Sequence, residues 1–372
     1  MKKRERLICL VLSATVLLNL SCRDHEEEEP VIPVEPATVS YTWPSAEHDA
    51  SGIILVSSPG YEFTFGNMEK AAEEHRNLVE MLEKNRIKVV DLKDIIEDMP
   101  PDSQRTAQQM IVPNLYFTRD PFIVTPKGVV IGKMRNQLRR REPELAAMCL
   151  HHLGIEPVYK ICGEEAVLEG GDYLPFGTVA FVASGLRTNR AAIDEMMAAD
   201  VLGHDTIVVV NDRKLWNNEM HLDTYFNIID RDLVTIVKDR LNAKIDEIYY
   251  LPVEVFARDG KAGERYYRKI ESDLSLEEFL TRRAIRIIPV TVFDARTFAN
   301  NFLCIAPRHI VAVEGQSQEL QQMLKDAGVQ VDWILMKELL KGNGAIHCMT
   351  KVLKTANTSP PCGSIKIIRS HV

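Results

Sequence analysis

The segment DPFIVTPKGVVIG, from Asp120 to Gly132, decides the fold because its pattern returns three more times along the chain. In each copy an acidic or amide residue precedes a short apolar strand, a turn and a second apolar strand. The other copies are DYLPFGTVAFVA from Asp172, DTYFNIIDRDLVTIV from Asp223 and NFLCIAPRHIVAVEG from Asn301. They start 52, 51 and 78 residues apart, and repetition at such intervals predicts an architecture built from repeats.

Helical patterns follow three of the copies, over 142–153, 189–199 and 317–327, and each ends near a glycine that leads into another strand. The expected unit is therefore strand, strand, helix, strand. We expect a fifth unit to form from the two chain ends, because residues 53–57 and the region around Cys348 otherwise lack partners. The sequence thus predicts an α/β fold with pseudo-fivefold repeats, in which each repeat buries the face that its neighbour exposes.

The first 21 residues differ in character from the rest and predict a secretion signal. Four basic residues precede an apolar run from Leu7 to Leu20, which is too short to span a bilayer. The ending LNLSC, residues 18–22, resembles a bacterial lipoprotein box, and this resemblance implies acylation of Cys22. A plain cleaved signal with an incidental cysteine is the alternative.

The segment after the signal is predicted to be a flexible tether over residues 22–50, followed by a single catalytic domain over 51–372. It is acidic over 24–29 and contains several prolines, which keep a chain extended. The acidic run resembles the surface-export signal of some Gram-negative lipoproteins, although a solvated linker fits equally well. We expect an exported protein attached by lipid to a bacterial membrane. One alternative for that membrane is the outer membrane, with the protein facing the cell exterior.

Composition excludes one large class of partners. The chain is 45% apolar and 26% charged, as globular proteins are, and its formal net charge is −8. Nucleic-acid binding needs a basic face, so no nucleic-acid partner is expected. The sequence leaves the oligomeric state open.

The cysteines point to one reactive thiol. Five cysteines remain after the predicted signal and Cys22, so at least one thiol is free or paired elsewhere. Cys149 and Cys304 lie in apolar patterns and are predicted to be core residues, whereas Cys162 and Cys362 could pair. No CxxC spacing indicates a metal site, so neither a metal nor a cofactor is expected. Cys348 is left as the thiol that needs a functional reason.

Four segments combine polar side chains with the beginnings of strands. They are PNLYFTRDPF (113–122), LEGGD (168–172), MHLDTYF (220–226) and GNGAIHCMT (342–350). Together they supply four carboxylates, the imidazole of His221 and the thiol of Cys348. Carboxylates gathered in one closed site repel one another unless a cation lies between them.

An organic cation suits this set better than a metal. A guanidinium is planar and permanently charged, and it matches carboxylates two hydrogen bonds at a time. Cys348 next to its carbon makes covalent catalysis possible, with His221 moving protons. Gly342 and Gly344 let the backbone approach the substrate closely. The sequence therefore predicts a cysteine enzyme that acts on a guanidino compound.

The four segments, in this order, resemble those of arginine deiminase, within the five-bladed guanidine-modifying (pentein) superfamily. The resemblance covers roughly residues 50–355 and implies a five-bladed α/β propeller. It implies hydrolysis of the guanidinium group of L-arginine or a close analogue to citrulline and ammonia, through a covalent amidino-cysteine intermediate.

The resemblance also implies roles for individual residues. Cys348 matches the nucleophile, His221 the general acid/base, Glu169 the carboxylate that orients the histidine, and Asp120 and Asp223 the pair that grips the guanidinium. The residues implied to contact the rest of the substrate are Asn114, Phe117, Arg139, Arg187, Asp172 and Asn343. The two arginines match those that hold the substrate α-carboxylate. Asp172 could instead stabilise the bend made by Gly170 and Gly171.

Two departures from the family pattern concern the substrate. Only residues 97–110 stand where the family usually carries a helical domain, and Asn343 occupies a position at which some members have an arginine. Related activities therefore stay open: methylarginine hydrolysis, agmatine or peptidylarginine deimination, and amidino transfer. A surface protein that binds a guanidino compound without chemistry is the rival from another class, and intact Cys348 and His221 count against it.

Overall fold

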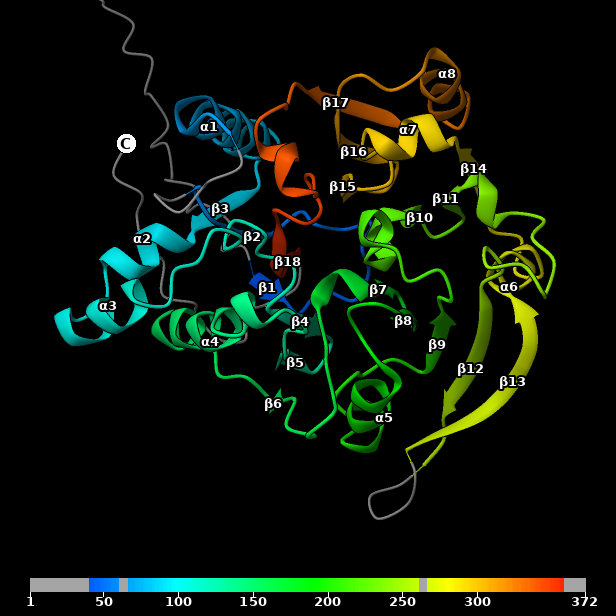
Figure 1. The fold of residues 1–372 in the computed structure, drawn as a ribbon, viewed down its shortest axis with the longest axis horizontal. Helices are drawn as coiled ribbons and strands as arrows, with labels where there is room; N and C mark the ends of the chain where they lie inside the picture. The colour runs from blue at the N-terminus through cyan, green and yellow to red at the C-terminus, as the bar shows by residue number, and fades with distance from the viewer. Residues whose placement is uncertain (1–39, 60–65, 261–265, 358–372) are drawn as a thin grey trace, which may run out of the picture. The chain divides into compact units, whose positions relative to one another are not determined.

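The computed structural model describes residues 40–59, 66–260 and 266–357 (Figure 1). The predicted signal, Cys22, Cys362 and the first part of the predicted tether lie outside these residues. Five sheets organise the described chain. Their strands, in order across each sheet, are β1 (Ser40–Thr42), β18 (Lys351–Asn357), β2 (Ile53–Val56) and β3 (Lys88–Asp91); β4 (Phe122–Thr125), β5 (Gly128–Ile131) and β6 (Tyr159–Lys160); β13 (Tyr267–Ser275), β12 (Pro252–Arg258), β9 (Thr206–Asn211), β8 (Val179–Ser184) and β7 (Tyr173–Phe176); β10 (Phe226–Asp230), β11 (Leu233–Val237) and β14 (Arg286–Val290); and β15 (Leu303–Ala306), β16 (His309–Val313) and β17 (Gln330–Ile334).

The same pairing order recurs in all five sheets. An antiparallel pair is followed by a parallel neighbour in β4-β5-β6, β7-β8-β9, β10-β11-β14 and β15-β16-β17. The chain ends supply the fifth case, in which β18 pairs antiparallel with β2 and β2 pairs parallel with β3. The described chain therefore has a mixed α/β fold in which the predicted copies each form the first strand pair of a sheet.

The folded chain begins earlier than the sequence indicated. Residues 40–50 were assigned to the tether, but β1 pairs with β18, and the amide of Glu47 donates to the Pro175 carbonyl at 2.9 Å. Glu47 itself is buried. The prolines and acidic residues around this stretch concealed it, because its partners are distant in sequence and short edge strands carry little apolar pattern.

Three of the α-helices lie where the periodicity predicted helices, over 142–153, 189–199 and 317–327. The α-helices are α1 (Met68–Lys84), α2 (Leu92–Glu97), α3 (Pro101–Gln108), α4 (Glu142–His152), α5 (Arg190–Ala198), α6 (Leu276–Thr281), α7 (Val292–Arg296) and α8 (Gln318–Asp326). Side-chain caps start several of them, since Asn67, Asn189 and Ser317 accept hydrogen bonds from the first turns of α1, α5 and α8. No helix in the described ranges is long and apolar enough to cross a bilayer.

Short 3₁₀ turns connect the sheets at the positions where polar residues gather. They are η1 (Gln137–Arg139), η2 (Gly170–Asp172), η3 (Asn217–Glu219), η4 (Leu222–Thr224), η5 (Lys238–Arg240) and η6 (Leu339–Gly342). Between helices and sheets lie apolar clusters, and they contain Cys149 and Cys304 as predicted. After β11 the chain forms β12, which pairs antiparallel with β9, and β13, which pairs antiparallel with β12, so both strands extend the sheet of β7 and β8.

One carboxylate anchors the loop that leads to Cys348. Glu74, on α1, accepts hydrogen bonds from the backbone amides of Lys337, Glu338 and Leu339 at 2.8–3.0 Å. These amides stand at the start of η6 and have no carbonyl partner within the turn, so a carboxylate satisfies them well. The glycine-rich loop is therefore tied to the first helix of the fold before it enters β18.

Candidate active site

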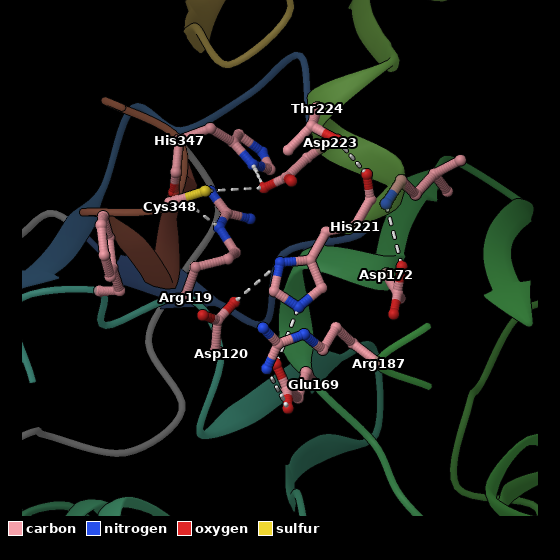
Figure 2. Close-up of polar contacts among 12 residues, drawn as sticks. Arg119, Asp120, Glu169, Asp172, Arg187, His221, Asp223, Thr224, His347 and Cys348 are labelled. Atoms are coloured by element: carbon pink, nitrogen blue, oxygen red, sulfur yellow. Dashed lines mark hydrogen bonds and ion pairs between the residues drawn. The ribbon is translucent and has the colours of Figure 1, made fainter. Parts of the chain in front are cut away.

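The predicted catalytic residues meet where strands begin. Asp120 stands just before β4, Glu169 before η2 and β7, and Cys348 before β18, while His221 and Asp223 frame the start of η4 ahead of β10. Figure 2 shows these side chains gathered around one region. Each belongs to a different sheet connection except the last two, so only the packing of the sheets brings them together.

His221 is held by carboxylates on both ring nitrogens. Its Nε2 lies 2.9 Å from Oε2 of Glu169, and its Nδ1 lies 3.8 Å from Oδ1 of Asp120. Burial opposes the charge, but Asp120 and the hydrogen bond to Glu169 outweigh it and raise the pKa of His221 to about 10. The raised pKa favours the imidazolium form of His221, which is able to donate a proton.

Cys348 faces Asp223, with 3.6 Å between Sγ and Oδ2. Burial, followed by the charges of Asp223 and Asp120, raises the pKa of the thiol well above its ordinary value. The protonated form of the thiol is thus favoured. It needs a neighbouring positive charge before it becomes a nucleophile.

Asp120 and Asp223 each keep one unsatisfied oxygen. Among the described residues, Oδ1 of each has no hydrogen-bond partner, although both side chains are buried. The other oxygen is engaged in each case, by Arg139 for Asp120 and by His347 for Asp223. Buried carboxylate oxygens without partners are costly, so the pair is complementary to a cation that carries N–H donors.

Arg139 does not lie where the resemblance placed it. Its guanidinium is buried, with both oxygens of Glu142 at 2.7 Å and Oδ2 of Asp120 at 2.7 Å. Burial lowers its pKa, but Glu142 and Asp120 overcome this effect and hold it above the ordinary value. These contacts use the donors that a substrate carboxylate would need, so Arg139 supports Asp120 in this structure.

The carboxylate of Asp172 contacts the backbone of a neighbouring turn. Its Oδ1 accepts the amide of Leu222 at 2.9 Å, which fixes η4 between His221 and Asp223. Burial raises the pKa of this carboxyl to about 7. The contact is not to the bend of Gly170 and Gly171, for which the sequence suggested a role, but to the turn that carries His221 and Asp223.

The other predicted substrate contacts differ in their exposure. Arg187 is 16% exposed, with Nη1 3.7 Å from Oε1 of Glu169 (Figure 2). Phe117 is buried, Asn114 is half-buried, and Asn343 is exposed with a left-handed φ of 66°, which asparagine tolerates. A Cβ at Gly344 would lie 2.5 Å from the Phe117 ring, so this glycine is required for the loop to pass.

Several polar residues at the site were not singled out by the sequence. Asn301 accepts the amides of Ala345 and Cys348 through Oδ1 and donates to the Asp223 carbonyl. Asn301 stands in the fourth repeat at the position where the other copies have an aspartate, and this pattern could have identified it. Arg119 and His347 lie inside the motifs quoted above. Glu47 lies in the predicted tether, where no sequence pattern indicated a role.

One group of described side chains has the spacing of a metal site. Asp120, Glu169 and His221 each offer a ligand atom, and these atoms lie within 4.8 Å of one another. In this structure they contact one another and Arg139. The hydrogen bond from His221 to Glu169 uses the nitrogen that would otherwise bind an ion.

Comparison with known proteins identifies the family of this chain. The family model for arginine deiminase matches residues 111–354, which include all five residues of the catalytic set. The chain belongs to the arginine deiminase family. An arginine deiminase of Listeria monocytogenes is 29% identical over 303 residues, covering 76% of this chain and 70% of that protein. Arginine deiminase 1 of Staphylococcus epidermidis is 30% identical over 266 residues, covering 65% and 62%.

Solved structures show the same fold. A mutant dimethylarginine dimethylaminohydrolase from Pseudomonas aeruginosa, in complex with citrulline, has a TM-score of 0.56 at 16% identity and covers 81% of this chain and 98% of that one. The N-terminal domain of a cyanobacterial arginine dihydrolase, bound to product, has a TM-score of 0.57 at 18% identity and covers 83% and 98%. The arginine deiminase family assignment and the pentein-type α/β fold therefore agree.

Gly171 sets the position of the general acid/base in this arginine deiminase family member. A Cβ there would lie 2.7–2.9 Å from the His221 ring. We expect Gly171→Ala to push the ring from Glu169 and to lower kcat/KM by roughly a hundredfold, the scale of a misplaced catalytic group. Steady-state kinetics on arginine measure this. Gly185→Ala is the control, since its Cβ would make an ordinary contact of 3.4 Å; equal activity of both variants would contradict the prediction.

Proposed function

We propose that this protein hydrolyses the guanidinium group of L-arginine to citrulline and ammonia. The observation that carries the proposal is the pair of unsatisfied Oδ1 atoms on Asp120 and Asp223, beside the thiol of Cys348 and the His221–Glu169 pair. A guanidinium supplies the missing donors and the missing positive charge at once. Family membership supports the reaction.

The first half of the reaction uses the charge of the substrate. The bound guanidinium offsets Asp120 and Asp223, the two charges that oppose ionisation of Cys348. The thiolate attacks the guanidinium carbon and forms a C–S bond. His221 gives its proton to the departing nitrogen, the C–N bond breaks, and ammonia leaves with the proton of the thiol, as ammonium. Cys348 then carries an amidino group as a thioether.

The second half restores the enzyme. Neutral His221, oriented by Glu169, takes a proton from water, which attacks the same carbon. The C–S bond breaks as the ureido group forms, and the second proton of the water passes to the sulfur of Cys348, while His221 keeps the first. One water is consumed and one ammonium ion is released, so protons and charge balance and the reaction needs neither oxidant nor cofactor.

The nucleophile is tested by substitution. Cys348→Ser should reduce ammonia and ureido product to background, because a serine hydroxyl is a far weaker nucleophile at neutral pH, whereas Cys162→Ser, at an exposed position, should stay active. Both are assayed with arginine, methylated arginine, agmatine and an arginine peptide. Near wild-type turnover by Cys348→Ser would contradict the covalent route. Wild-type enzyme that acts only on another compound of the panel would support a related guanidine-modifying activity instead.

Recognition of the substrate's far end is proposed to depend on Arg187. Arg139 is saturated by acidic partners, so Arg187 is the predicted carboxylate ligand that keeps partial exposure. We expect Arg187→Ala to lower kcat/KM for arginine by about ten- to a hundredfold, the loss of one charge-assisted contact, and to change agmatine hydrolysis little. Arg190→Ala, an arginine on α5 paired with Asp194, is the matched control. An equal loss on both substrates would rule out a role in carboxylate binding.

We also propose that the five sheets form the blades of one closed propeller around the site. Their shared antiparallel-then-parallel pairing supports this arrangement, as does the position of the catalytic residues at the starts of four of the sheets. A single domain of this kind, over the part of the chain after the signal and tether, would carry the whole activity.

The remaining proposal concerns location. The signal-like start and the box that ends at Cys22 support export and attachment to a bacterial membrane by lipid. Mass spectrometry of the protein from its native host should find an acylated Cys22 at the N-terminus, and Cys22→Ser should move the protein to the soluble fraction. An unmodified N-terminus that begins after Cys22 would exclude the anchor.

A further inference from the structure

A second buried histidine connects the active site to the N-terminal segment. Nδ1 of His347 lies 2.7 Å from Oδ2 of Asp223, and its Nε2 lies 3.2 Å from Oε2 of Glu47. His347, Asp223 and Glu47 are 1%, 0% and 6% exposed, so water does not compete for these contacts. Figure 2 shows the ring of His347 directed at Asp223 beside Cys348.

Glu47 is placed by contacts on both sides. Its amide donates to the Pro175 carbonyl, and its Oε1 accepts Nη1 of Arg119 at 3.0 Å. Arg119 also donates through Nε to the carbonyl of His347 at 3.0 Å. The same guanidinium therefore orients the carboxylate and the backbone of the histidine that the carboxylate contacts.

The ring faces carboxylates at both nitrogens. A neutral imidazole donates from one nitrogen only, whereas the imidazolium donates from both, so both hydrogen bonds are made by the charged form. Burial opposes ionisation of Glu47, but the charges of Arg119 and His347 and the hydrogen bond from His347 lower the pKa of Glu47 to about 2. The anionic form of Glu47 is thus favoured at neutral pH.

This charge acts on the two groups that the reaction uses. His347 occupies Oδ2 of Asp223 and so leaves Oδ1 as the acceptor for a substrate. The same Oδ2 lies 3.6 Å from Sγ of Cys348, where the negative charge of Asp223 opposes thiolate formation. A cation on Oδ2 reduces that opposition.

We propose that His347, held as a cation by Glu47, is a positioning residue that fixes Asp223 and favours the Cys348 thiolate. The inference rests on the proposed function, for which it adds a charge relay from the N-terminal segment to the nucleophile. Three charged groups face the ring from other parts of the chain: Asp223 from η4, Glu47 from the segment before β2, and Arg119 from the loop before β4. Cys348 and Lys351 follow His347 in the chain. Lys351 interacts with Glu47 and Asp223 through its charge.

The experiment measures the reactivity of Cys348 in the ligand-free, full-length protein. The labelling rate with iodoacetamide is followed by mass spectrometry of the Cys348 peptide, between about pH 6 and pH 9, where imidazole and thiol groups titrate. The variants are His347→Asn, which keeps a donor near the position of Nδ1 without the charge, and Glu47→Gln, which keeps the shape without the anion. His204→Asn is the matched control, since His204 is an equally buried histidine that contacts Tyr173 and Gly177.

Both variants are expected to move the pH profile of Cys348 labelling toward higher pH. His347→Asn should label Cys348 roughly tenfold more slowly below the pKa of the thiol, the effect of one pKa unit at the thiol. Glu47→Gln should give a smaller shift in the same direction, because the ring keeps its contact with Asp223 but loses the negative charge at Nε2. A merely structural role would not shift the profile.

The outcomes separate the relay from the reaction. Wild-type labelling by both variants, or an equal loss in His204→Asn, would overturn the relay. Should His347→Asn fail to fold, the profile of Glu47→Gln decides alone. Labelling needs no turnover, so a wild-type protein that is inactive on every guanidino compound would contradict the proposed function and leave the relay supported by its profile.

Discussion

The burial of several carboxylates in one place is the constraint on which the rest of the structure depends. Asp120, Glu169, Asp223 and Glu47 come from distant parts of the chain and share a region from which water is largely excluded. Charges of one sign in such surroundings are stable only if each has a partner. The protein supplies Arg139, His221, Arg119 and His347 for this purpose, and it leaves two oxygens for a cationic ligand.

The repeats of the fold bring the charged residues and their partners together. Each repeat places a polar residue just before the first strand of a sheet, where the backbone changes direction and the side chain is not needed for the apolar core. Because the sheets share one pairing order, these positions meet although they are separated by many residues. At the same position of another repeat stands the uncharged Asn301, whose side-chain amide joins the Cys348 loop to the Asp223 loop.

The partners of the carboxylates also decide which groups can react. Asp120 and Glu169 raise the pKa of His221, and burial together with Asp223 and Asp120 raises the pKa of Cys348. A cation bound between Asp120 and Asp223 would lower the pKa of the thiol. Recognition of a guanidino compound and activation of the proposed nucleophile would then have one physical cause.

Residue pattern alone determined the strands, the helices and most of the catalytic set. Apolar periodicity placed α4, α5, α8 and the four internal strand pairs, and the motifs indicated Cys348 and His221, because these signals are local. It could not determine which charged groups touch. Arg139 was assigned to the substrate but pairs with Asp120 and Glu142, and Glu47 was assigned to a tether but reaches His347. Ion pairs between distant segments leave no periodic trace, so only the packing of the sheets decided them.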